Sequence, residues 1–281
     1  MLRTVRERVR EKLGRALQEY VVTEIQREGR DQRAVLEALR ADVERLTAEQ
    51  RSGTERSEAA MRAWERRQRR DVITALERRT AETTATFVHE QMERATPHFA
   101  KDETMAAALA AVDVTGLYLE FGVASGGTLR QIASTAPAGA VFGFDSFEGL
   151  PEKWRAGFEV GAFAMEALPE VEGAELVVGW FDQTLPAFLA AHPEPVAFLH
   201  LDADLYSSTV TVLEALQDRL QVGTVVMFDE YFNYPGWEEH EHRAWVEFVD
   251  RAGVQFEYLG FTADDEQLSL RITALGGTDQ G

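Results

Sequence analysis

The stretch "VAFLHLDADLYSSTVTVLEALQDRL" (residues 196–220) decides the fold class. It opens as a nearly continuous apolar run, which is typical of a strand buried on both faces, and it continues as a helix-like segment over 208–220. A buried strand that leads directly into a helix is the repeating unit of an α/β fold. Asp202 and Asp204 stand where the strand ends, with no Lys or Arg beside them in the sequence.

The same alternation recurs on both sides of this stretch. Further strands are expected at 116–123, 140–147, 174–181 and 223–231, and helices at 128–135, 185–192 and 238–252. Two neighbouring runs, 255–261 and 268–275, are expected to form an antiparallel pair at a sheet edge. The predicted fold class is therefore α/β, with a Rossmann-like, doubly wound, mostly parallel sheet. Such sheets bind ligands at the carboxyl ends of their strands, where the polar residues of this sequence gather.

Residues 1–96 differ in character and are predicted to form a helical, partly coiled-coil-like extension to a domain at 97–281. From residue 2 to residue 93 the chain has no proline and only three glycines. Two apolar series have helical spacing: Leu13, Leu17, Val21 and Ile25, and then Leu36, Leu39, Val43 and Leu46. The segment 49–58 is expected to interrupt the helix. The extension is expected to pack on the second part or on another subunit, so that a homo-oligomer is one outcome.

The charge distribution and the composition exclude some classes of binding partner and metal site. Residues 1–95 hold 21 Lys/Arg and 18 Asp/Glu, whereas the rest of the chain holds 8 and 30, so the net charge of −19 comes from the second part. An acidic surface repels phosphate backbones, and the arginines of 62–79 alternate with acids as on a solvated helix face. No nucleic acid partner is therefore expected. The sequence contains no cysteine, which excludes disulfides and thiolate metal sites.

The sequence shows neither the pattern of a transmembrane helix nor that of a signal peptide. No apolar run approaches the ~20 residues that span a bilayer. The first segment is charged throughout, unlike a signal peptide. A cytoplasmic protein with no membrane span is expected.

A Gly-rich turn, "EFGVASGGT" (120–128), follows the first strand of the α/β part and opens a helix. Its G-x-x-x-G-G spacing differs from the G-x-G-x-x-G fingerprint of dinucleotide-binding folds. Glu120 suits a cofactor with a cationic amino group, such as S-adenosylmethionine, and Asp145 at the end of the next strand suits ribose hydroxyls. A turn that serves only packing is the alternative. The residues expected to bind the cofactor are Glu120, Gly122, Ser125, Gly126, Thr128, Asp145, Ser146, Phe147, Asp182 and Asp202.

Four acids are expected to share one crevice. A second apolar run, "VVMFDEYF" (225–232), contains Asp229 and Glu230 where its strand is expected to end, and its strand is expected to neighbour the one that ends in Asp202 and Asp204. Carboxylates at close range destabilise a fold unless a cation neutralises them, and Mg²⁺ prefers oxygen ligands. One acid could remain free as a general base. The alternative is that some of these acids cap the following helices, Asp204 in particular.

The histidines carry less information. His240 and His242 are two residues apart, so on a helix they face different directions, and both are expected to be exposed. His200, two residues before Asp202, is either a core residue or a general base.

Four motifs in this order resemble the macrocin O-methyltransferase family. They are "LEFGVASGGT" (119–128), "GFDSFEGLPEKW" (143–154), "HLDADLYSST" (200–209) and "VVMFDEYFNYPGW" (225–237). The resemblance covers roughly residues 98–270 and does not extend to the N-terminal arm. That family consists of class I S-adenosylmethionine-dependent enzymes that methylate sugar hydroxyls on antibiotics and related glycosides.

The resemblance implies a role for each of the four acids. Asp202, Asp229 and Glu230 would bind magnesium, and Asp204 would be the general base. Related members carry Asp-Asp where this chain has Asp229 and Glu230, which makes Glu230 the less certain ligand. The second motif would form a lid over the cofactor, with Phe147, Leu150 and Trp154 as its apolar cover.

The function expected is therefore a Mg²⁺-dependent O-methyltransferase that acts on a hydroxyl of a sugar or glycosylated natural product. One alternative acceptor is the terminus of a surface glycan, with the helical arm as a dock. A nicotinamide-dependent dehydrogenase and a non-catalytic assembly protein on a Rossmann-like sheet are the rival functions.

Overall fold

The computed structural model describes residues 2–276, with side chains described from residue 10 onwards. The chain divides into two compact units, one ending at Val72 and the other beginning at Ile73. Helix α2 (Val72–Gln91) thus lies almost wholly in the second unit. The expected start of the catalytic domain at residue 97 stays a prediction. Within residues 2–276, no helix has the length and apolar composition needed to cross a bilayer.

The first unit consists of one uninterrupted helix, α1 (Leu2–Arg70). The expected interruption at 49–58 is wrong, because the helix runs straight through Gly53. A single glycine costs a helix only about 1 kcal/mol, and this segment has no proline to remove a backbone hydrogen bond. From residue 10 onwards, the large apolar side chains of α1 are solvent-exposed, as Leu36 at 58% and Leu39 at 56% illustrate.

The second unit alternates strands and helices along the chain. After α2 its elements are β1 (Thr96–His98), α3 (Lys101–Ala110), β2 (Leu117–Phe121), α4 (Gly127–Thr135), β3 (Val141–Asp145), β4 (Ala174–Val178), α5 (Phe181–Ala191), β5 (Val196–Leu201), α6 (Tyr206–Leu216), the 3₁₀ helix η1 (Gln217–Arg219), β6 (Val225–Phe228), the 3₁₀ helix η2 (Trp237–Glu239), α7 (Glu241–Ala252), β7 (Gln255–Thr262) and β8 (Leu268–Ala274).

These strands form one sheet in the order β1-β7-β8-β6-β5-β2-β3-β4. Its pairs are parallel except the two that β8 makes, so the predicted mostly parallel doubly wound fold is confirmed. The predicted antiparallel pair exists as β7 and β8, but β8 lies inside the sheet and the short β1 covers the outer side of β7. Strand β3 lies on one side of β2 and β5 lies on the other, so the order in which strands are added reverses there. The topological switch point of the sheet therefore lies between β2 and β5.

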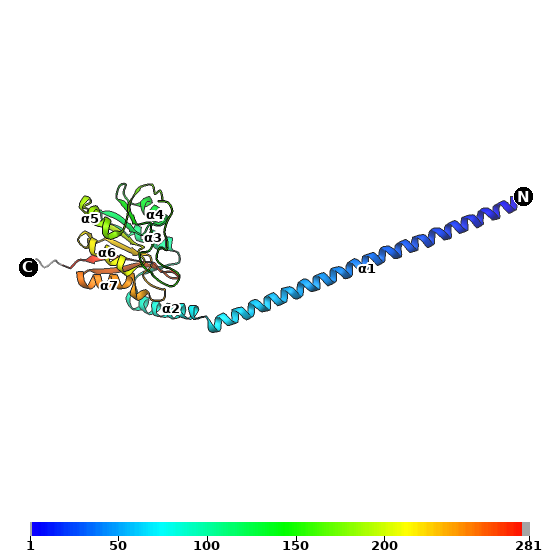
Figure 1. The fold of residues 1–281 in the computed structure, drawn as a ribbon, viewed down its shortest axis with the longest axis horizontal. Helices are drawn as coiled ribbons and strands as arrows, with labels where there is room; N and C mark the ends of the chain where they lie inside the picture. The colour runs from blue at the N-terminus through cyan, green and yellow to red at the C-terminus, as the bar shows by residue number, and fades with distance from the viewer. Residues whose placement is uncertain (1, 277–281) are drawn as a thin grey trace, which may run out of the picture. The chain divides into compact units, whose positions relative to one another are not determined.

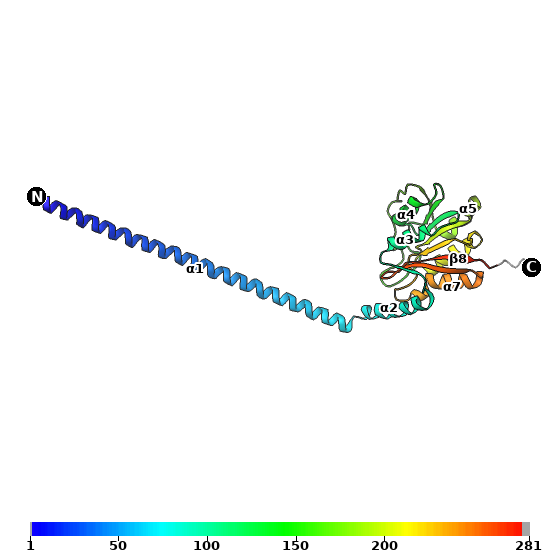
Figure 2. The ribbon, with the colours of Figure 1, turned by 180° about the vertical axis from the view of Figure 1, so that it is seen from behind.

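Helices cover both faces of the sheet, as Figures 1 and 2 show. On one face, Met105 of α3 and Leu129 of α4 pack with Phe198 and Met227. On the other face, helices α5, α6 and α7 pack with the side chains that alternate with these, such as Leu199 and Phe228. Every residue of β5 is buried, which explains its nearly continuous apolar sequence.

Candidate active site

A cavity of about 550 Å³ lies at the carboxyl ends of the central strands. It adjoins the switch point between β2 and β5, where open α/β sheets bind their ligands. Its lining residues are Gly122, Ala124, Asp145, Ser146, Gly149, Leu150, Pro151, Phe163, Trp180, Phe181, Asp182, Gln183, Asp202, Ala203, Asp204, Ser207, Ser208, Thr211 and Glu230. The cavity therefore joins the Gly-rich loop to three of the four predicted acids.

Gly122 allows the ends of β2 and β5 to meet at this cavity. Its φ is +94°, and a Cβ atom there would lie 1.8 Å from the carbonyl oxygen of Asp202. The amide of Asp202 in turn donates to the carbonyl of Phe121 at 2.9 Å. Only glycine combines this conformation with so close an approach.

Asp145 holds the Gly-rich loop in place. Its Oδ2 accepts hydrogen bonds from the amides of Val123 at 2.9 Å and Ala124 at 2.8 Å, and its Oδ1 accepts one from Phe147 at 2.7 Å. A carboxylate has about four lone-pair sites, so one remains available for a ligand hydroxyl. The structure thus gives Asp145 a loop-organising role that the sequence did not reveal, beside its expected place at the cavity.

The structure brings only half of the expected cofactor residues to the cavity wall. Those that line it are Gly122, Asp145, Ser146, Asp182 and Asp202; those that do not are Glu120, Ser125, Gly126, Thr128 and Phe147. Glu120 is fully buried and bonds through Oε1 to Nδ1 of His200 at 2.9 Å. Of the expected lid residues, Leu150 lines the cavity, whereas Phe147 and Trp154 are buried in the core.

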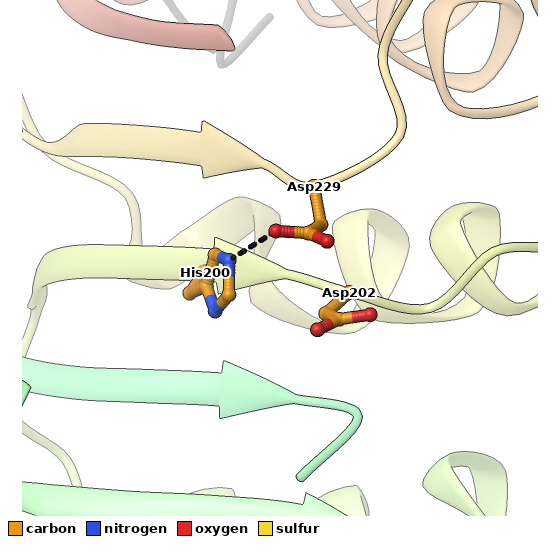
Figure 3. Close-up of side chains that lie close together, drawn as sticks. All are labelled: His200, Asp202 and Asp229. Atoms are coloured by element: carbon orange, nitrogen blue, oxygen red, sulfur yellow. Dashed lines mark ion pairs between the residues drawn. The ribbon is translucent and has the colours of Figure 1, made fainter. Parts of the chain in front are cut away.

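The four acids converge as two overlapping groups. Ligand atoms of Asp202, Asp204 and Glu230 lie within 4.8 Å of one another, and so do those of His200, Asp202 and Asp229. Figure 3 shows the second group at the ends of β5 and β6. The predicted neighbourhood of the two strand ends is confirmed. The structure does not, however, gather the three expected metal ligands into one such group.

Two basic side chains lie against Asp229, although no Lys or Arg stands beside the four acids in the local sequence. Nζ of Lys101 on α3 lies 2.7 Å from both carboxylate oxygens of Asp229. Nε2 of His200 lies 3.6 Å from Oδ1 of Asp229, the ion pair drawn in Figure 3. Lys101 is 128 residues away in sequence, on a helix that the apolar pattern did not predict.

Glu120, His200, Asp229 and Lys101 thus form a chain of ion pairs that is buried except at Lys101. Burial opposes a charged imidazole, but the interactions with Asp229 and Glu120 raise the pKa of His200 to about 10. Burial likewise opposes the Asp229 carboxylate, but His200 and Lys101 lower the pKa of Asp229 to about 2. Asp229 is therefore ionised and neutralised by side chains of the protein itself. This places His200 in a structural charge network within the core.

The acids that face the cavity have raised pKa values, whereas the pKa of Asp229 is lowered. Burial, and then the charge of Asp229, raises the pKa of Asp202. Burial, and then the charges of Asp202 and Asp229, raises the pKa of Glu230. Oε2 of Glu230 is buried and has no hydrogen-bond partner among the described residues. Among the described residues, no Lys, Arg or His side chain forms an ion pair with Asp202 or Glu230, unlike Asp229.

Asp204 has an unusual backbone conformation. Its φ is +59°, and the amide of Leu205 donates to the carbonyl of Ala203, which makes a tight and strained γ-turn. Burial, offset in part by Arg155, raises the pKa of Asp204 to about 7. Helix α6 begins after Leu205 with no side-chain cap, so the alternative in which Asp204 caps that helix is wrong. In this strained conformation Asp204 lines the cavity, which is typical of a functional position.

Glu241 is a fifth acid that the sequence did not single out. It is fully buried at the start of α7, where Oε1 accepts from the amide of Ala203 at 3.4 Å and Oε2 from the amide of Glu230 at 3.2 Å. Glu241 therefore ties the two acidic strand ends together. Burial, and then the charge of Asp204, raises its pKa.

The two histidines expected to be exposed are partly buried. His240 precedes the first turn of α7, so the argument from helical spacing did not apply to it. The ring of His242 packs against Phe87, Tyr231 and Trp237, with centroids 4.7–5.3 Å apart. Burial lowers the pKa of His242 to about 4.

The cavity-facing acids fit a hard divalent cation. Mg²⁺ takes carboxylate oxygens in octahedral geometry, and a buried oxygen without a partner is available on Glu230. Asp202 and Asp204 supply further oxygens within the same 4.8 Å. A cation there would also favour the ionised forms that burial disfavours.

The comparisons with known proteins agree with this geometry. Residues 119–231 match the sequence profile of a family described as "Methyltransferase domain". The 8-demethyl-8-(2,3-dimethoxy-alpha-L-rhamnosyl)-tetracenomycin-C 4'-O-methyltransferase of Streptomyces olivaceus is 33% identical over 146 residues, which are 42% of this chain and 54% of the relative. Demethyldecarbamoylnovobiocin O-methyltransferase of Streptomyces niveus is 33% identical over 94 residues, which are 31% of this chain and 35% of the relative. This chain thus spans about half, or less, of the length of these curated relatives.

One solved structure is similar in both sequence and fold. The crystal structure of CalS11, a calicheamicin methyltransferase, superposes with a TM-score of 0.50 and 27% identity, over 60% of this chain and 77% of that one. The residues that match the profile include the Gly-rich loop, Asp145 and all four acids of the predicted site. Residues 119–231 thus match the methyltransferase domain profile, and the resemblance to class I S-adenosylmethionine-dependent methyltransferases of the macrocin O-methyltransferase type is confirmed.

Proposed function

We propose that this protein transfers the methyl group of S-adenosylmethionine to a hydroxyl of a sugar or glycosylated natural product, with Mg²⁺ as a second cofactor. The observation that carries the proposal is the grouping of Asp202, Asp204 and Glu230 on the wall of the cavity beside the Gly-rich loop. The names of the two curated relatives, an O-methyltransferase of a rhamnosyl-tetracenomycin and one of demethyldecarbamoylnovobiocin, support the class of reaction.

The loop side of the cavity suits the cofactor. Gly122, Asp145 and Ser146 line it on one side, and Trp180, Asp182 and Gln183 line it at the end of β4. Asp145 fixes the loop through three backbone amides before any ligand arrives. S-adenosylmethionine supplies an electrophilic methyl group on a sulfonium sulfur.

The acidic side of the cavity suits the acceptor hydroxyl and the metal. Asp204 takes the proton of the hydroxyl, since its raised pKa of about 7 matches a general base that works near neutrality. Mg²⁺ supplies Lewis acidity that favours the deprotonated hydroxyl. We assign Asp202 and Glu230 to the metal, and Asp229 as a third ligand that would exchange its contact with Lys101 for the ion while His200 keeps it ionised. Glu241 fixes the spacing between the two strand ends.

The variant Asp204→Asn tests the proposal. It keeps the size of the side chain and removes the base, so we expect turnover to fall by about 10²- to 10⁴-fold while cofactor affinity stays within about twofold. Turnover is measured as formation of S-adenosylhomocysteine with a panel of glycosides and Mg²⁺. Cofactor affinity is measured by calorimetry. Asp218→Asn, an exposed aspartate of η1, is the matched control and should retain full turnover. Wild-type turnover in Asp204→Asn would contradict the mechanism.

The same calorimetry separates the rival functions. Binding of NAD without binding of S-adenosylmethionine would favour a dehydrogenase. A protein that binds no cofactor, or consumes none with any acceptor, would favour a non-catalytic assembly role. The choice between a small glycoside and a glycan terminus, the cytoplasmic location and self-association through the N-terminal helices are further parts of the proposal.

A further inference from the structure

Helix α1 exposes apolar side chains that a single helix has no means to bury. Leu36, Leu39, Val43 and Leu46 are each 56–58% exposed. The unit that ends at Val72 contains this one helix, so no second element of that unit covers them. Isolated helices in water gain little stability on their own and depend on packing of an apolar face. The exposed face therefore indicates a partner.

The spacing of these residues defines the face. Positions 22, 25, 29, 32, 36, 39, 43 and 46 alternate by three and four residues, and we call them the seam. Apolar side chains occupy six of them, with Gly29 and Gln32 as the exceptions. Such a 3-4 repeat keeps one stripe turned toward a partner helix in a left-handed coiled coil. Val43 and Leu46, in the last heptad of the seam, are the β-branched residue and the leucine that favour two parallel strands, whereas Ile25 and Leu36 depart from that choice.

Charges beside the seam distinguish the two orientations. Acids precede the first seam position of two heptads, namely Glu28 and Asp42, whereas Arg33 and Arg40 follow the second position. In a parallel pair the two flanks face each other, so that Glu28 lies opposite Arg33 of the partner subunit. In an antiparallel pair each flank faces its own kind, which sets acid against acid and arginine against arginine. Like charges at these positions disfavour pairing.

Ion pairs within the described part of α1 do not involve Glu28 or Arg33, the two residues expected to pair between helices. Asp42 and Glu49 both pair with Arg45 of the same helix, at 2.8 and 3.6 Å. Glu28, Arg33 and Arg40 make no ion pair within the described side chains of α1. Their charges are therefore free to act between helices.

We propose that α1 forms a parallel, in-register, two-stranded coiled coil with α1 of a second copy of this chain. The pairing rests on residues 22–46 and is independent of the methyltransferase chemistry. It places residue n of one helix beside residue n of its partner along the whole seam.

The first test is the mass of the full chain in solution. We expect about twice the 31.5 kDa of the monomer by sedimentation equilibrium at micromolar concentration. The double variant Leu39→Glu, Val43→Glu places charges in the seam and should return the monomer mass. The control Ala34→Glu, Ala41→Glu adds the same charges to the opposite face and should keep the dimer. A wild-type monomer, a trimer, or a dimer that survives the seam substitutions would overturn the proposal.

The second test is the orientation, which the absence of native cysteine makes simple. Val22→Cys and Leu46→Cys, each purified separately, should each form a disulfide-linked dimer under mild oxidation. An antiparallel pair would cross-link residue 22 to residue 46, so that only a mixture of the two variants would react. That result would overturn the parallel arrangement. Turnover of the cross-linked protein, measured in parallel, distinguishes failure of this proposal from failure of the proposed reaction.

Discussion

Replacement of Lys101 by methionine should weaken the fold and strengthen metal binding at the same time. The ammonium lies 2.7 Å from both oxygens of Asp229, and that carboxylate is 4% exposed. Methionine retains most of the apolar stem and removes the charge. His200 then remains as the nearest cation to Asp229.

The shift in the pKa of Asp229 gives the scale of the loss. Against the cost of burial, His200 and Lys101 lower this pKa from 3.8 to about 2. A shift of almost two units is worth about 2.5 kcal/mol of stability at neutral pH. Because His200 supplies part of that, and Lys101 is about one third exposed, we expect Lys101→Met to cost about 1–2 kcal/mol. The stabilisation is present above pH 4 and is lost as the pH falls toward 2.

Two measurements check this prediction. Urea unfolding at pH 7 with a chelator should show the loss of stability. Calorimetry with Mn²⁺ should show tighter binding, because the net negative charge beside the metal residues increases. Lys153→Met is the matched control, since Lys153 also lies 2.7 Å from a carboxylate, that of Glu159, but both side chains are largely exposed. Such pairs contribute 0–1 kcal/mol. Equal stability losses in the two variants, or weaker metal binding in Lys101→Met, would refute the reasoning.

Three further outcomes follow from the site and its surroundings. Turnover should rise with pH up to about 7 and level off above it, because Asp204 must lose a proton that burial helps it to retain; a rate independent of pH between 5.5 and 8 would argue against Asp204 as the base. Burial lowers the pKa of His242 to about 4, so as the pH falls the unfolded chain binds this proton at a higher pH than the folded protein does. Up to about 3 kcal/mol of folding stability should therefore be lost between pH 6.5 and pH 4. His242→Leu should remove this pH dependence in urea titrations, whereas the exposed His89→Leu should keep it. Gly122→Ala should destabilise the protein by more than 2 kcal/mol and impair cofactor binding, because its Cβ would meet the carbonyl of Asp202; an Ala variant with normal stability would contradict the observed geometry.

Topology explains what the sequence could predict about the site. Parallel strands end at the same edge, so two apolar runs that each finish in paired acids predict that Asp202 and Asp229 are neighbours. The Gly-rich turn similarly predicts the position of the loop. These inferences need only the order of strands and the direction of the chain.

The sequence did not predict the contacts of Glu120 and Lys101, because these contacts depend on the direction in which individual side chains point. Glu120 lies one residue before the end of β2 and opposite His200 on β5, so the two side chains share one buried face of the sheet. A shift of one residue along a strand exchanges the two faces, and the apolar pattern did not reveal this phase. Lys101 was missed because α3 is short and alanine-rich and lacks a clear apolar stripe, so nothing in the sequence related it to Asp229.

The excess of buried acid at the cavity has a consequence for selectivity. Asp202, Asp204 and Glu230 face the space that substrates enter, whereas Lys101 and His200 are occupied with Asp229. Acceptors that carry a carboxylate or phosphate near the reacting hydroxyl would meet repulsion, while neutral sugars and amino sugars would not. In the proposed reaction, the same negative charge would attract the positively charged sulfonium more strongly than the neutral thioether that remains after transfer. It would thus help to select the acceptor and to release the spent cofactor.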